Sequence, residues 1–116
     1  MFISGIILII IDSTYLSIIS NYFSTLLLKI QNKPMKIRLL GAVICYILLV
    51  LGLNYFIISK KGSLLSAFLL GILIYGVYES TNYAIFTDWE LFPLIVDTLW
   101  GGILFYATTG LTYLLV

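Results

Sequence analysis

The segment Phe2–Leu28, FISGIILIIIDSTYLSIISNYFSTLLL, decides the fold class of this protein. Within it, the run Ile6–Ile11 is continuously apolar and shows no alternation of apolar and polar residues. A strand of a membrane barrel would alternate over about 10 residues. Lipid offers no partner to unpaired backbone groups, so a long apolar run must satisfy them internally. The segment therefore predicts a transmembrane α-helix, which needs about 20 apolar residues.

Composition extends this prediction to the whole chain. The 116 residues are 62% hydrophobic and 9% charged, and the mean hydropathy is +1.16. Soluble domains are about 25% charged, which excludes a water-soluble globule. A net charge of +1 argues against nucleic acid as a partner. The predicted fold is an all-α, integral membrane, four-helix antiparallel bundle, a single transmembrane domain over 1–116 with helices at about 2–28, 37–58, 62–86 and 91–116.

The breaks between the runs predict the topology. Four helices place both termini on one side of the bilayer, and basic residues prefer cytoplasmic loops. The third loop carries only acidic residues, Asp88 and Glu90. The basic residues favour a cytoplasmic first loop and non-cytoplasmic termini, since Lys29, Lys33, Lys36 and Arg38 lie in the first loop against Lys60 and Lys61 in the second.

Three carboxylates, Asp12, Glu79 and Asp97, lie inside the apolar runs. No Lys or Arg lies well inside any of these runs, and the chain has no His. Each must be protonated, paired with another carboxyl, bound to a cation or reached by water. A helix rises about 1.5 Å per residue, so Glu79 and Asp97 lie at a similar depth, near the loop that joins the third and fourth helices. Asp12 is expected in another layer unless the first helix tilts or protrudes past the others. The pair is either a proton or cation site, or a hydrogen-bonded lock between helices.

Two short motifs resemble one another. Ile11–Tyr15 and Val96–Trp100 both read apolar, Asp, hydroxyl, any residue, aromatic. Their helices are expected to run antiparallel, as an inverted repeat requires.

Small residues recur at helical spacing and predict close-packed helix faces, although the serines would also suit the lining of a wet path. The predicted packing residues are Ser13, Ser17, Ser20 and Ser24 in the first helix, with Ser63, Ala67 and Gly71 in the third. Trp89 is predicted to be an interface anchor, and the nine tyrosines fit interfacial belts.

The sequence lacks a nucleophile–base pair, a metal-ligand cluster and a phosphate loop. With no His, most hydrolytic sites are excluded. We expect no enzyme activity, no cofactor and no metal site.

At this point the sequence resembles the small predicted membrane proteins grouped as domain of unknown function 2177. The resemblance implies a four-helix membrane protein with a common polar set and implies no activity. The residues that carry it are Asp12-x-x-Tyr15-Leu16, Gly62–Leu65, Tyr78–Asn82, Asp88-Trp89 and Asp97-x-x-Trp100-Gly101. The implied polar set is Asp12, Glu79, Asn82, Asp97 and Trp100.

Two functions fit these features. The first is a structural or accessory subunit of a membrane assembly, in a host complex or the internal membrane of a large virus, meeting lipid, other membrane proteins or further copies through its helices. The second is a small proton- or cation-coupled transporter that uses the intramembrane carboxylates.

Overall fold

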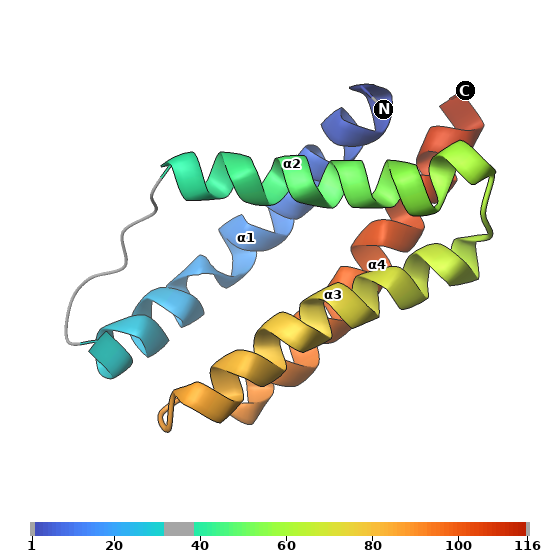
Figure 1. Cartoon of the computed structure of the whole chain (residues 1–116). Helices are drawn as coiled ribbons and strands as arrows, with labels where there is room; N and C mark the ends of the chain where they lie inside the picture. The colour runs from blue at the N-terminus through green and yellow to red at the C-terminus, as the bar shows by residue number, and fades with distance from the viewer. Residues whose placement is uncertain (1, 32–38, 116) are drawn as a thin grey trace.

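The computed structural model describes residues 2–31 and 39–115, which form four long α-helices (Figure 1). They are α1 (Phe2–Gln31), α2 (Leu39–Phe56), α3 (Leu64–Ile85) and α4 (Leu91–Leu115), with a short 3-10 turn, η1 (Ile58–Lys60), after α2. The described residues contain no strand. All four helices are long and apolar enough to cross a membrane, so the predicted fold class is confirmed.

The helix ends lie close to their predicted positions. Helix α1 continues three residues past Leu28, so Lys29 lies in its last turn and not in a loop. The other basic residues predicted in the first loop, Lys33, Lys36 and Arg38, lie outside the described residues. Between α2 and α3 the chain reverses at Lys61, which takes a left-handed conformation with a φ of 52°.

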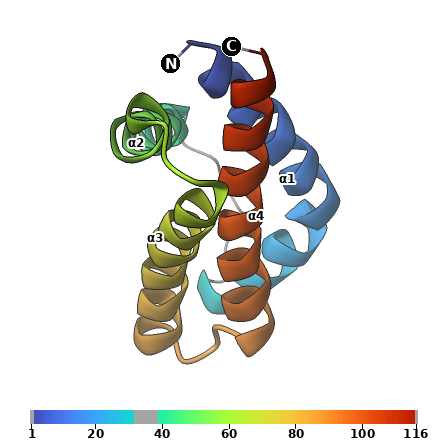
Figure 2. The same cartoon turned by 90° about the vertical axis from the view of Figure 1, so that its right-hand side faces the viewer.

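The helices pack unequally. Helices α3 and α4 lie side by side and antiparallel, with the most extensive contact in the molecule, and α1 packs against α4 (Figure 1). Helix α2 contacts α1 and crosses the α3–α4 pair at a steep angle, so it is seen nearly end-on in Figure 2. The start of α1 and the end of α4 lie at the same end of the bundle, as an even number of antiparallel helices requires.

The contact between α3 and α4 depends on glycine. A Cβ atom built on Gly71 would lie 2.0 Å from the carbonyl oxygen of Gly101, and one built on Gly101 would lie 2.4 Å from the ring of Tyr75. Ala67, one turn before Gly71, is also fully buried. Small residues at four-residue spacing thus let the two backbones approach closely, as they do in many membrane proteins.

The serine stripe of α1 lies elsewhere than expected. Ser13 and Ser17 are exposed, and Ser20 and Ser24 are only half-buried. Helix α1 packs instead through the face of Leu8 and Asp12, because the buried carboxyl of Asp12 finds its hydrogen-bond donors on α2 and α4.

Ser63 also differs from the prediction of a packing residue. It is the N-cap of α3, and its hydroxyl accepts a hydrogen bond from the backbone N–H of Ser66 at 3.0 Å. Its role is therefore to begin the helix, since a serine at this position satisfies a backbone donor that has no partner within the helix.

Candidate functional site

The three intramembrane acids all point into the bundle. Their side chains are nearly inaccessible, with exposed fractions of 6% for Asp12, 0% for Glu79 and 8% for Asp97. Each lies on the buried face of its helix. Asp12 follows the buried Leu8 by four residues on α1, and Glu79 follows the buried Gly71 by eight residues on α3. Burial of this kind requires each carboxyl to have hydrogen-bond partners.

Asp12 accepts one hydrogen bond on each carboxyl oxygen. The phenol of Tyr46 on α2 donates to Oδ2 at 2.5 Å, and the indole of Trp100 on α4 donates Nε1–H to Oδ1 at 2.9 Å. A single carboxyl on α1 therefore joins α1 to two other helices. Ionised carboxylates are acceptors only, so two donors match this side chain well.

Asp97 lies between α1 and α3. The phenol of Tyr15 on α1 donates a hydrogen bond to its Oδ1 atom. The carboxyl of Glu79 on α3 is a neighbour of the Asp97 carboxyl. The Oε1 atom of Glu79 accepts a hydrogen bond from Nε1 of Trp89 at 3.0 Å. The two acids predicted to pair are thus adjacent.

The two resembling motifs contact one another reciprocally. Asp12 of the first motif accepts from Trp100 of the second, and Asp97 of the second accepts from Tyr15 of the first. The rings of Tyr15 and Trp100 stack between the two acids, with centroids 4.4 Å apart and planes 8° from parallel. Since α1 and α4 are antiparallel, equal three-residue spacings bring each Asp opposite the aromatic residue of the other motif.

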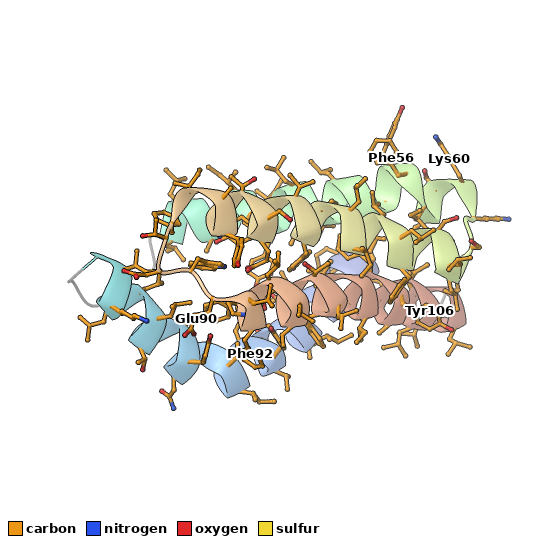
Figure 3. The ribbon with its side chains drawn as sticks, turned by 90° about the horizontal axis from the view of Figure 1, so that it is seen from below. Phe56, Lys60, Glu90, Phe92 and Tyr106 are labelled. Carbon is orange, nitrogen blue, oxygen red and sulfur yellow. The ribbon has the colours of Figure 1, made fainter. Side chains whose placement is uncertain are left out.

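The depth estimate placed Asp12 in another layer, but the structure places it beside Trp100, one turn from Asp97. A depth counted from the helix ends is valid only where α1 ends level with the start of α4. Tyr22 already contacts Glu90 beside the start of α4, and α1 runs on for nine more residues to Gln31. Because α1 extends past the turn, counting from its end overestimates the distance between Asp12 and Asp97. Glu90 and Phe92 mark this end of the bundle in Figure 3.

Two of the tyrosines that fit interfacial belts by composition lie inside the bundle. Tyr15 and Tyr46 both donate to buried acids. Tyr46 stands within a run of Ile, Leu and Val residues in the middle of its helix. The position of this tyrosine, far from the helix ends, is a sequence signal for a hydrogen bond to a buried acid, because a buried phenol needs an acceptor.

Asn82 stands apart from these hydrogen bonds. It lies three residues after Glu79 on α3, and its buried Nδ2 atom has no hydrogen-bond partner within the described residues. The structure thus brings together four of the five members of the implied polar set and leaves Nδ2 of Asn82 without a hydrogen bond to the acids.

Trp89 differs from the predicted interface anchor. It lies in the turn between α3 and α4, yet its side chain is only 7% exposed. Its indole N–H is directed to the buried carboxyl of Glu79, and its ring lies beside Phe23 and Phe86. A buried indole needs an acceptor for its N–H group, and here Glu79 provides it inside the bundle.

We expect Trp89 to be shielded from both water and lipid. In a Trp100→Phe variant, in which Trp89 is the single tryptophan, its fluorescence should resist quenching by aqueous iodide and by brominated lipid alike. The matching Trp89→Phe variant reports Trp100 under the same conditions. Strong quenching of Trp89 by iodide or by lipid brominated near the headgroup would instead place it at the interface.

A metal centre is not evident in this site. Within residues 2–31 and 39–115, no three His, Cys, Asp or Glu side chains are grouped closely enough to hold a metal ion. The arrangement can accept hydrogen bonds and hold protons.

Fold and site together define a class: an integral, multi-pass membrane protein of four helices whose buried acids are held by aromatic donors from neighbouring helices. The chain matches the family described as "Predicted membrane protein (DUF2177)" over residues 1–114. It belongs to this family, as the resemblance of its motifs implied. Comparison with curated proteins and with solved structures finds no match.

Proposed function

We propose that this chain acts as a structural or accessory subunit of a membrane assembly. The observation that carries the proposal is the use of the acids as ties between helices. Asp12 has a donor on each oxygen, from α2 and from α4, and Asp97 receives Tyr15 from α1. Polar side chains that hydrogen-bond across helices are a common means of holding membrane bundles together.

Helix α2 supports the same proposal. Only Leu49, Leu53 and Asn54 of this helix are buried within the chain. Its other faces are apolar and exposed, with Leu48 as an example. Phe56 and Lys60, at the end of this span, point outward in Figure 3. A helix with so little contact inside its own chain leaves most of its surface for lipid or for other membrane-spanning helices.

The test is the mass and composition of what co-purifies with the tagged chain from its native membrane in mild detergent. We expect a stoichiometric assembly much larger than the 13.1 kDa chain. A Leu48→Asn variant on α2 should release the partners, and Ile103→Asn, also exposed but on α4, is the matched control. Recovery of the bare chain alone, from membranes in which it is folded, would contradict the proposal.

The second candidate is a proton-coupled transporter. It is favoured by the grouping of the buried acids: Glu79 is a neighbour of Asp97, and the stacked rings of Tyr15 and Trp100 link Asp97 to Asp12. Here Asp97→Asn and Glu79→Gln should abolish proton-driven flux in vesicles that contain only this chain. The purified chain showing no flux, or both variants retaining it, would argue against transport.

A further inference from the structure

The contact between Glu79 and Asp97 lacks one hydrogen-bond donor. Two donors, Tyr15 and Trp89, serve the two carboxyls, and each occupies one oxygen. The other oxygen of Glu79, Oε2, is buried and has no donor among the described residues. Asp12 offers the contrast, because its two oxygens have one donor each. The missing donor is therefore specific to the place where two carboxyls meet.

Electrostatics indicates what lies beside Oε2 of Glu79, where the donor is missing. Two carboxylates in contact repel one another, and burial away from water strengthens that repulsion. The basic residues that the structure describes, Lys29, Lys60 and Lys61, all lie at helix ends and not beside the pair. A proton between the two carboxyls removes one charge and supplies the missing hydrogen bond at once. Adjacent carboxyls in other proteins adopt the same solution.

We infer that Glu79 and Asp97 form a binding site for a single proton, held between Oε2 of Glu79 and the carboxyl of Asp97. The proton converts a repulsive contact into a hydrogen bond that ties α3 to α4. Tyr15 and Trp89 stabilise the remaining negative charge, because Tyr15 donates to Oδ1 of Asp97 and Trp89 to Oε1 of Glu79. This site is a property of the chain itself and does not depend on its proposed role in an assembly.

The surroundings of the pair contain few other titratable groups. From α1 it faces Tyr15, with Tyr22 close enough to interact with Glu79 and Asp12 beyond the ring of Trp100. From α2, Tyr46 lies on the far side of Asp12. From α3, the phenol of Tyr75 is close enough to interact with Asp97. All these groups are phenols or carboxyls, so none of these neighbours supplies a positive charge to the pair.

Infrared spectroscopy of the full chain in lipid nanodiscs tests the inference. A protonated carboxyl has a C=O stretching band that a carboxylate lacks. At neutral pH we expect a band equivalent to one protonated carboxyl per chain. Glu79→Gln and Asp97→Asn should each abolish the whole band, because an amide donates the missing hydrogen bond and the remaining acid stays ionised. Asp12→Asn, the matched control, should leave the band unchanged.

Each other result contradicts a shared proton. Absence of the band in the unsubstituted chain means that both carboxyls are ionised, or that another cation separates them. Loss of half of a two-carboxyl band in each variant means that the acids bind protons independently. Loss of the band in Asp12→Asn alone places the proton on Asp12. If a variant fails to fold, the unsubstituted chain still tests the shared proton. Raising the pH removes that proton, so the band must disappear and the unfolding temperature must fall over the same pH range.

Discussion

Replacing Gly71 with alanine should destabilise the protein by at least about 2 kcal/mol. The added Cβ would lie 2.0 Å from the carbonyl oxygen of Gly101 and 2.5 Å from its carbonyl carbon. Both are backbone atoms, which cannot rotate away, so α3 and α4 would have to move apart along their whole contact. The measurement is the free energy of unfolding in mixed detergent micelles, followed by helical circular dichroism.

Gly52 is the matched control for this substitution. It also lies within a helix, but a Cβ built on it meets nothing within 4 Å. Gly52→Ala should therefore be neutral or stabilising by up to about 1 kcal/mol, because alanine favours helix more than glycine does. Equal losses at both positions would show that the close approach of α3 and α4 is not what Gly71 provides.

Replacing Asp12 with alanine should cost about 2 kcal/mol of stability. The substitution removes the acceptor of two buried donors, the phenol of Tyr46 and the indole N–H of Trp100. It also releases α2, whose contacts with the rest of the chain are few. Asp88, an exposed acid in the turn between α3 and α4, is the control, and Asp88→Ala should have little effect.

A double-mutant cycle separates the contribution of the Tyr46–Asp12 hydrogen bond from the general effect of removing a charge. Asp12→Ala and Tyr46→Phe should be coupled, with an interaction energy of about 1 kcal/mol, near the range measured for hydrogen bonds between membrane helices. Since removal of a buried acid by itself relieves a desolvation cost, stabilisation by Asp12→Ala together with zero coupling would show that Asp12 does not hold α2 in place.

The helices themselves were predictable from the sequence. Backbone hydrogen bonds in a helix join residues four apart, so a continuous apolar run such as Ile6–Ile11 settles its own secondary structure once lipid surrounds it. The adjacency of Glu79 and Asp97 was also predictable. Their helices are joined by a short turn, and each acid lies a similar number of residues from that turn.

The differences arose where the surroundings of a side chain depend on how the helices pack. Trp89 was predicted at the interface because it stands between Asp88 and Glu90, but its N–H is directed inward to Glu79. Ser13 and Ser17 have the spacing of a packing face, yet they are exposed. Spacing identifies the residues that share a face and does not tell which face meets another helix.

Four membrane helices, and three acids with no basic partner well inside the apolar runs, follow from the order of residues alone. The meeting of the two Asp-x-x-aromatic motifs, with Asp12 opposite Trp100 and Asp97 opposite Tyr15, depends on how the helices pack. The difference lies in the range of the interactions. Helix formation is local, whereas the register of α1 against α4 depends on how far α1 extends past the α3–α4 turn, which residues more than 80 positions apart settle together.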